Sequence, residues 1–462
     1  MEYRKTIPKA AIFLLIGLLA TSSYASETKS LITKETHPSL LLITVDTLRA
    51  DRLPFYGYKR NTAPFLGKLA EHGIVFANAY STSSWTVPAV TSLVTGVYPS
   101  SHGVMRGSIK KGRVYKQEIV PRKLPNLPEQ LRALGYRTYA VTASYHLTKE
   151  LGFGRGFDQY ACIGFCTAEK VNRAFLEWKH EIESQNSPVF IWLHYFDPHI
   201  PYIARQPWLK HYQSDETEGE RSTISSISRP VKLRQVLKKN EPRILTLIQS
   251  HYDSEINYCD EQIKKLFQEF PSLDQYVLVF TADHGEEFME HGKLGHANNL
   301  YNDTVRIPLF VRIPSSASAT TSKEVASLVD IAPTLLAIAG GKAPLSWQGR
   351  ALIDQKGHVS PREERYVLAQ LNNGIVSSMN ALIGSNWKLI INDKTQDKQL
   401  YNLMDDPTER TNLTTAKPEK TKQQSDILQK LVLTLPPAPK AKKNKPLQKD
   451  KEEMLRSLGY IQ

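Results

Sequence analysis

The sequence predicts an α/β fold with a mostly parallel central sheet flanked by helices, followed by a small C-terminal antiparallel α+β subdomain. Five apolar runs have the length and continuity of buried parallel strands, and segments with helical spacing lie between them. Such an alternation is typical of α/β domains. After Gly341 the pattern changes to short runs separated by turn residues, which favours a second, antiparallel sheet. The 462 residues are enough for one large core and a smaller one.

The first strand is predicted over 38–46, an apolar run that ends in Asp46, and a helix follows over 62–73 with Gly73 as its stop signal. Further strands are expected over 137–143, 188–196, 276–283 and 307–314, and further helices over 126–136, 169–183, 244–270 and 329–340. We expect the polar, Ser-rich stretch 214–230 to be an inserted loop. The C-terminal part has strand-like runs over 365–371, 376–384, 386–392 and 398–403, and then a helix around 419–433.

The N-terminus has the order of a secretory signal peptide. Basic residues at 4, 5 and 9 precede an apolar run over 10–20, and Ser23-Tyr24-Ala25 offers a small-residue cleavage site. The run is shorter than the roughly 20 residues that span a bilayer, although an uncleaved anchor is an alternative. We therefore expect a signal peptide over 1–25, a periplasmic or secreted protein, and no transmembrane span in the mature chain. The expected parts are then a catalytic domain (38–341), a C-terminal subdomain (342–435) and a basic linker with a terminal segment (436–462).

The chain is basic, with a formal net charge of +13. A basic balance suits an anionic substrate or surface, and no nucleic-acid motif is present. The three cysteines do not make a disulfide framework. Cys162 and Cys166 are close enough in sequence to form a local bridge, and the alternative is that all three cysteines are unpaired.

Polar residues gather where the predicted strands end, and in such sheets ligands bind outside the carboxyl ends of the strands. They are Asp46, then His194, Asp197 and His199, and then Asp283 and His284. Asp46, Asp283 and His284 offer two carboxylates and an imidazole, which is a plausible metal set, with a structural Asp–His pair as the alternative. Thr86 lies on a loop that enters a short helix, whose free N–H groups would attract an anion. We interpret His194 as a core histidine, because it lies on an apolar strand.

Several motifs follow one another in order from about Ser39 to Gln462. They include LLLITVDTLRADRLPFYGY, SSWTVPAVTSLVTGVYPSSHGV, FIWLHYFDPHIPY, VFTADHGEEFMEHGKLGHANNLYNDTVRIPLFV and LRSLGYIQ. Together these motifs resemble the sulfatase family of the alkaline-phosphatase superfamily. The resemblance implies an ester hydrolase with a metal held by Asp46, Asp283 and His284, and with Thr86 as the nucleophile that completes the shell. It also implies that His199 protonates the leaving group or holds the substrate. His146 matches the histidine of the family's Gly-Lys-Trp-His segment, and His296 lies within about a residue of a family lysine that binds the anionic group.

The sequence departs from the sulfatase pattern at five positions. Thr86 replaces the cysteine that sulfatases oxidise to formylglycine, Val90 replaces an arginine, and Ser144 a lysine. Thr47 replaces the second acid of an Asp-Asp pair, and His284 lies where many sulfatases have Asn. Formylglycine acts as its hydrate, and the second hydroxyl expels sulfate; a threonine has no second hydroxyl. Its ester must be displaced by water, which suits phosphorus better than sulfur. The loss of two cationic contacts favours a diester over a more highly charged monoester.

We therefore predict a hydrolase of phosphate or sulfate esters with Thr86 as its nucleophile, leaning to phosphodiesters. The alternatives are a true sulfatase and an inactive family member that binds an anionic glycan. One divalent ion is expected, Zn²⁺ or Mn²⁺ in preference to Ca²⁺. A second metal held by Asp197, His199 and His296 is conceivable. The alternative is that Asp197 only caps a turn before Pro198. The expected partner is an anionic ester such as a phosphorylated or sulfated glycan or a lipid head group.

Overall fold

A computed structural model describes residues 37–439 and residue 453, except 107, 112–113, 213–214, 228–234, 236–240, 315–319, 355, 360–363 and 373–377. The predicted signal peptide (1–25) lies outside these residues, as does nearly all of the predicted basic linker. No helix within the described part of the chain has both the length and the apolar character that crossing a membrane requires.

The core is an eight-stranded sheet in the order β12-β2-β11-β8-β1-β7-β5-β6. β1 lies in its middle and pairs in parallel with β7 and β8, which places Thr44 opposite both His194 and Thr281. Only β11 runs antiparallel to its neighbours. The predicted mostly parallel sheet is therefore confirmed. The strands are β1 (Leu40–Val45), β2 (Ile74–Tyr80), β5 (Arg137–Thr142), β6 (Gln159–Cys162), β7 (Val189–Tyr195), β8 (Val277–Ala282), β11 (Leu309–Arg312) and β12 (Thr320–Ser327).

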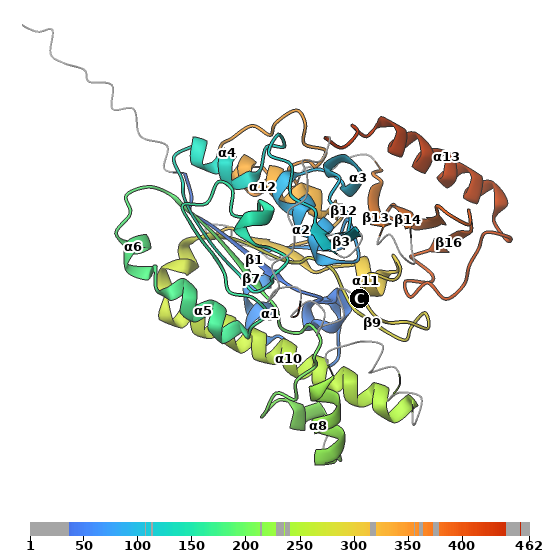
Figure 1. Ribbon diagram of the computed structural model, residues 1–462, viewed down its shortest axis with the longest axis horizontal. Coiled ribbons are helices and arrows are strands. Elements are labelled where there is room, and N and C mark those ends of the chain that lie inside the picture. The colour runs from blue at the N-terminus through green and yellow to red at the C-terminus, as the bar shows by residue number, and fades with distance from the viewer. Residues whose placement is uncertain are drawn as a thin grey trace, which may run out of the picture. The chain divides into compact units, whose positions relative to one another are not determined.

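Helices cover both faces of this sheet, as a buried parallel sheet requires (Figure 1). One face carries α1 (Pro64–Ala70), α5 (Ala168–Leu176) and the long α10 (Glu241–Glu269), and the other carries α2 (Thr86–Thr95), α4 (Leu127–Ala133) and α12 (Ile331–Ile338). Short helices are α3 (Pro99–His102), α6 (Lys179–Glu183), α7 (Leu209–Tyr212) and α11 (Asn302–Val305). Two hairpins lie outside the sheet, β3 (Ser108–Lys111) with β4 (Val114–Gln117), and β9 (Glu287–Phe288) with β10 (Leu294–Gly295).

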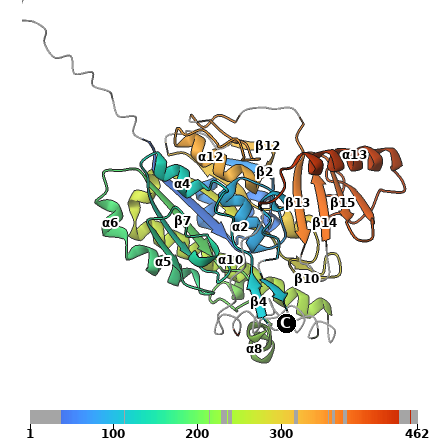
Figure 2. The same cartoon turned by 45° about the horizontal axis from the view of Figure 1, so that its top comes forward.

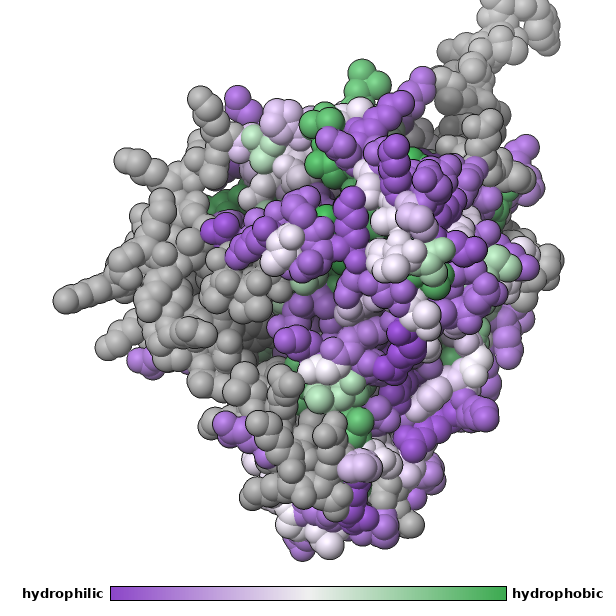
Figure 3. Space-filling view, turned by 90° about the vertical axis from the view of Figure 1, so that its right-hand side faces the viewer, coloured by the Kyte–Doolittle hydropathy of each residue, from purple (hydrophilic) through white to green (hydrophobic). Residues whose placement is uncertain are grey.

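The C-terminal part forms a separate four-stranded antiparallel sheet, as predicted. Its strands run in sequence order and lie side by side in Figure 2, and α13 (Pro418–Thr434) packs on β14 and β15. The strands are β13 (Val367–Asn372), β14 (Ser378–Ile383), β15 (Trp387–Asn392) and β16 (Lys398–Asn402). The face shown in Figure 3 is largely hydrophilic, with scattered small apolar patches.

The structure corrects some of the local expectations. The expected loop over 214–230 is wrong, because α8 (Glu218–Ser226) lies within it. Thr217 and Glu220 form a reciprocal capping box that begins this helix, and Arg243 of α10 binds Glu220. The expected helix over 169–183 is divided into α5 and α6 at Glu177–Trp178. All three cysteines are free thiols, so the unpaired alternative holds.

Candidate active site

Four of the predicted side chains meet at the carboxyl end of the central strands. Asp46 follows β1, Asp283 and His284 follow β8, and Thr86 is the first residue of α2. The Nε2 atom of His284 lies 3.3 Å from Oγ1 of Thr86, 3.5 Å from Oδ1 of Asp46 and 3.6 Å from Oδ2 of Asp283. None of the four residues is more than 1% exposed. The cluster is therefore buried and closely spaced.

Backbone geometry aims these side chains. Thr47 has a positive φ of 56°, unfavourable for a β-branched residue, and its N–H donates to Oδ1 of Asp283 over 3.3 Å. The N–H of His284 donates to the same oxygen over 2.8 Å, so Oδ2 of Asp283 is left facing His284. Gly285 has no room for a side chain, because a Cβ there would lie 2.1 Å from the carbonyl oxygen of Asp303.

The tautomer of His284 follows from its second ring nitrogen. Nδ1 lies 2.9 Å from the carbonyl oxygen of Gly285, which can only accept a hydrogen bond. Nδ1 of the neutral ring therefore carries the hydrogen, and the lone pair of Nε2 faces Thr86, Asp46 and Asp283. This nitrogen can accept the hydroxyl proton of Thr86 or bind a metal.

The Thr86 loop is anchored on both sides. The indole N–H of Trp85 donates to the carbonyl of Met105 over 3.1 Å, and the N–H of Ala297 donates to the carbonyl of Ser84 over 2.8 Å. The second contact ties the loop that carries His296 to the loop that carries Thr86. The first N–H groups of α2 have no partner within the helix, so they favour an anion beside Thr86.

Three further histidines surround the cluster. The ring of His296 lies 4.6 Å from that of His284 and 5.0 Å from that of His199, measured between centroids. Nδ1 of His199 lies 2.6 Å from the carbonyl of Ile200 and therefore donates, which leaves Nε2 of the neutral ring as an acceptor. His146 packs against Trp85 with ring centroids 5.5 Å apart. All three predicted histidines thus lie beside the Thr86 cluster.

Glu286 is a member of this group that the sequence did not single out, although it belongs to the DHGEE segment. Its Oε1 atom lies 2.9 Å from Nδ1 of His296, and Glu286 is fully buried. Burial alone lowers the pKa of His296, but the charge of Glu286 and its hydrogen bond outweigh burial and raise it. The pair therefore favours an imidazolium next to Thr86.

A positive partner would stabilise the two buried carboxylates, Asp46 and Asp283. Burial raises the pKa of Asp46 to about 7, and burial together with the charge of Asp46 raises the pKa of Asp283 to about 8. Burial, aided by the charge of His296, keeps the pKa values of His284 and His199 well below their ordinary range. Neutral imidazoles cannot offset the carboxylates, so a cation between them would stabilise the cluster.

The donor atoms fit a divalent metal. Oδ1 of Asp46, Oδ2 of Asp283 and Nε2 of His194 are buried without a hydrogen-bond partner. One ligand atom from each of these three residues lies within 4.8 Å of the others. Two ligand atoms that each lie about 2.1 Å from one ion are about 3.4 Å apart at a tetrahedral angle, close to the spacings around His284. Carboxylate oxygens with imidazole nitrogens suit Zn²⁺ or Mn²⁺.

His194 corrects an expectation from the sequence. It is fully buried, as a core histidine would be, but its Nε2 atom lies 3.8 Å from Oδ2 of Asp46. The pairing of β1 with β7 brings the two together, and that register cannot be read from either strand alone.

Asp197 lies in a different environment. Its Oδ2 atom accepts the N–H of Ala168 over 2.7 Å, and its Oδ1 atom accepts from Arg205 over 2.6 Å. Both oxygens are therefore engaged, and Asp197 caps the N-terminus of α5. The side chain thus caps α5 and not the expected turn before Pro198. The second metal site with Asp197, His199 and His296 stays a prediction.

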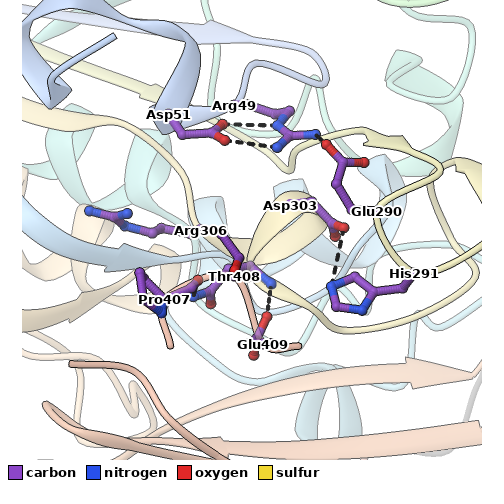
Figure 4. Close-up of a pocket in the computed structure, with 10 residues that line it drawn as sticks. Arg49, Asp51, Glu290, His291, Asp303, Arg306, Pro407, Thr408 and Glu409 are labelled. Carbon is purple, nitrogen blue, oxygen red and sulfur yellow. Dashed lines mark hydrogen bonds and ion pairs between the residues drawn. The ribbon is translucent and has the colours of Figure 1, made fainter. Parts of the chain in front are cut away.

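A cavity of about 200 Å³ lies behind the loop that follows Asp46. Figure 4 shows Arg49 between Asp51 and Glu290, and Asp303 facing His291. Arg49 binds Asp51 over 2.8 Å and Glu290 over 2.6 Å. Glu409, from the loop after β16, reaches the same cavity and accepts the N–H of Asn302. This network joins the Asp46 loop, the β9–β10 hairpin and the C-terminal subdomain.

A second cavity, of about 380 Å³, lies on the other side of the histidines. Its wall residue Phe165 packs against His146 at 5.9 Å and against Phe196 at 4.8 Å, and Phe196 stacks on His199 at 4.4 Å. The cavity also has Tyr145, Ile163, Cys166, Lys170 and Arg173 in its lining. It combines an aromatic wall with the cations Lys170 and Arg173 and one carboxylate, Glu177, and Arg173 also pairs with Glu169.

Comparison with known families decides the classification. Residues 38–341 match the sulfatase family model, and residues 290–435 match the model of the N-sulphoglucosamine sulphohydrolase C-terminal region. The chain belongs to the sulfatase family. Sulfatase-family members are metal-dependent ester hydrolases, so the chain is a sulfatase-family hydrolase with a buried group that can hold a metal.

Relatives of this sulfatase-family chain include enzymes with different names. The ulvan-active sulfatase of Formosa agariphila is 26% identical over 72% of the chain, which spans 56% of that protein's length. Among solved structures, a 2-O GAG sulfatase superposes with a TM-score of 0.69 at 18% identity, covering 86% of the chain and 92% of the other. The phosphonate monoester hydrolase of Agrobacterium radiobacter superposes with a TM-score of 0.66 at 18% identity, covering 86% and 95%. These two structural similarities concern the fold alone.

Proposed function

We propose that this sulfatase-family hydrolase cleaves phosphodiesters, with Thr86 as a metal-bound nucleophile. The observation that carries the proposal is the position of the Thr86 hydroxyl, 3.3 Å from Nε2 of His284 at the N-terminus of α2. We propose a divalent ion whose ligands are Asp46, Asp283, His284 and Thr86. Such an ion would lower the pKa of the Thr86 hydroxyl, and the hydroxyl proton would pass to solvent. It would also offset negative charge on the ester.

The reaction then has two displacements at phosphorus. Oγ1 of Thr86 forms a bond to phosphorus, the bond to the leaving oxygen breaks, and the proton held at Nε2 of His199 passes to that oxygen. In the second step a water oxygen attacks phosphorus, its proton returns to Nε2 of His199, and the bond between Oγ1 and phosphorus breaks. Burial opposes protonation of His199, and the negative charge of a bound ester favours it.

The charge around the ester favours a diester. Val90 and Ser144 occupy positions where the family has cations, and both are fully buried. The His296 imidazolium, supported by Glu286, is the cation that we assign to the ester oxygens. A phosphodiester carries one negative charge and needs fewer cationic contacts than a phosphate monoester, which carries two. A sulfate monoester carries one charge, as the diester does. A sulfate ester remains the second candidate, because the family relatives include enzymes named sulfatases.

We further propose that the Phe165 cavity holds the substituent remote from the cleaved bond. Lys170 and Arg173 would contact an anionic group there, and the ring of Phe165 suits a sugar face. This favours an anionic glycan ester as the substrate class. Phe165→Ala should raise KM for such extended esters and leave small nitrophenyl esters unchanged.

The location and the division of the chain remain part of the proposal. We propose that residues 1–25 are a signal peptide that directs the protein to the periplasm or outside the cell. The three parts 38–341, 342–435 and 436–462 follow from the sequence pattern. Mass spectrometry of the secreted protein tests the first point, since a mature N-terminus near Ser26 is expected.

The experiment that tests the activity uses matched nitrophenyl esters. Wild type, Thr86→Ser and Thr86→Val would be assayed on bis(4-nitrophenyl) phosphate, 4-nitrophenyl phosphate and 4-nitrophenyl sulfate, with bound metal measured in each preparation. We expect diester turnover to be fastest, to persist in Thr86→Ser and to vanish in Thr86→Val. Turnover of the sulfate that depends on Thr86 would favour a sulfatase, and metal binding without turnover of any ester would favour a binding protein.

A further inference from the structure

We infer that His194 is a ligand of the metal, binding through Nε2 together with Asp46 and Asp283; this inference deepens the proposed function and rests on it. The sequence pattern favours a core histidine at position 194, and the shell proposed above contains His284 as its only imidazole.

We assign the tautomer of His194 from its contact with Thr44. Its Oγ1 atom accepts the indole N–H of Trp192 over 2.9 Å and lies 3.4 Å from the carbonyl oxygen of Leu193, to which it donates. The same oxygen lies 2.8 Å from Nδ1 of His194. A hydroxyl has one hydrogen and two acceptor lone pairs, and we assign its hydrogen to the Leu193 carbonyl, which can only accept. In this assignment Nδ1 donates to Thr44 and carries the ring hydrogen, and Nε2 presents its lone pair.

That lone pair faces a carboxylate. Nε2 of His194 lies 3.8 Å from Oδ2 of Asp46, which is beyond hydrogen-bond range, and Nε2 has no hydrogen-bond partner. A lone pair and a carboxylate repel each other unless a cation lies between them. The atoms of Asp46, His194 and Asp283 converge within 4.8 Å, which is the arrangement that a shared ion satisfies.

The support behind the ring is typical of metal-binding histidines, which donate their other N–H to an oxygen that fixes their orientation. Trp192, Thr44 and His194 form such a chain and are all fully buried. Two imidazoles with two carboxylates favour borderline ions such as Zn²⁺ over Ca²⁺. The ligand role of His194 therefore predicts which ion the protein selects, not only how tightly it binds.

The test measures metal affinity in the full chain. The protein is stripped with a chelator, and its dissociation constants for Zn²⁺ and Ca²⁺ are measured for wild type, His194→Leu, His194→Gln and Thr44→Val, beside the exposed control His358→Ala. If His194→Leu does not fold, His194→Gln replaces it, because glutamine retains a polar side chain. We expect at least a hundredfold weaker Zn²⁺ binding without His194, a change of less than about threefold for Ca²⁺, and a loss of about 10- to 100-fold in Thr44→Val. The absorption spectrum of the Co²⁺ form should change with His194.

Zn²⁺ affinity within about threefold of wild type with an unchanged Co²⁺ spectrum would overturn the inference. Equal weakening of Zn²⁺ and Ca²⁺ would also overturn it, because His194 would then act only by orienting Asp46. A different result would refute the proposed function alone. If wild-type protein binds Zn²⁺ through His194 but hydrolyses no ester, the proposed activity is refuted and the ligand role of His194 still holds. Wild-type protein that binds no divalent ion refutes both.

Discussion

Nδ1 of His296 lies 2.9 Å from Oε1 of Glu286, where Glu286 is fully buried and His296 is partly buried. In our proposal the His296 imidazolium supplies a cationic contact to the ester, which Val90 and Ser144 cannot do. Its charge depends on the Glu286 carboxylate, which raises the pKa of His296, and on pH.

Glu286→Gln tests this dependence. Without the carboxylate the pKa of His296 should fall, so the imidazolium should persist only at lower pH. We expect kcat/KM for a phosphodiester to drop about 10- to 100-fold at pH 7, and its decline with rising pH to begin at a lower pH than in wild type. His296→Lys is the matched control, because it should hold its charge and lose this pH dependence. An unchanged pH profile in Glu286→Gln would contradict the role of the pair.

Removal of the metal should make stability depend on pH. The pKa values of Asp46 and Asp283 are raised in the folded metal-free chain, to about 7 and about 8. A carboxyl with a raised folded pKa binds its proton more tightly when folded, so its contribution to stability is present below pH 4 and is lost as pH rises to 8.

Urea unfolding of chelator-treated protein between pH 5 and 8.5 measures this effect. We expect the metal-free protein to lose stability over that window, and Asp283→Asn to lose less. Metal-free stability that rises with pH would show that the carboxylates are not strained by burial.

Thr47→Asp should change the metal preference. It restores the second acid of the family's Asp-Asp pair, and aspartate tolerates the positive φ of this position better than threonine. We expect Ca²⁺ affinity to rise about tenfold while Zn²⁺ affinity changes less, because carboxylate oxygens suit hard cations. Calorimetric titration with each ion provides the comparison; a preference that moves towards Zn²⁺ would argue against Thr47 facing the metal.

A buried ion pair lies within the C-terminal subdomain, and both of its partners hydrogen-bond to Asn302 of the catalytic domain. Nζ of Lys388 lies 2.8 Å from Oε1 of Glu409, and both side chains are fully buried. Lys388→Met leaves a buried charge without a partner, so we expect a loss of about 3–5 kcal/mol in the free energy of unfolding. The double variant Lys388→Met/Glu409→Gln should recover much of it. Arg173→Met, which breaks an exposed pair with Glu169, is the control and should cost less than about 1 kcal/mol.

Much of the fold could be predicted because its strands are unusually plain apolar runs. β1, β7 and β8 are continuous apolar stretches buried on both faces, and such runs are typical of buried parallel strands. β12 was missed because TTSKEVAS is polar at one end, and α8 was missed because its Ser-rich composition resembles a loop. The helix depends on the capping box of Thr217 and Glu220, a weaker signal than periodicity.

The site could be predicted where motif and strand end coincide, as for Asp46 and Asp283. His194 and Glu286 required the structure. His194 meets Asp46 only through the register between β1 and β7, and Glu286 meets His296 only because the β9–β10 hairpin folds back. Neither the contact of His194 with Asp46 nor that of Glu286 with His296 can be predicted from spacing along the sequence.

The central claim is that Thr86 forms a covalent phosphoryl ester, and rapid-quench mass spectrometry tests it most directly. Metal-loaded protein would be mixed with bis(4-nitrophenyl) phosphate, quenched in acid and digested, and the peptide that contains Thr86 would be examined. Our account predicts a 4-nitrophenyl phosphoryl group on Thr86 that appears with the first nitrophenolate and is absent from Thr86→Val. Turnover that continues with Thr86 unmodified, or that survives in Thr86→Val, would contradict it.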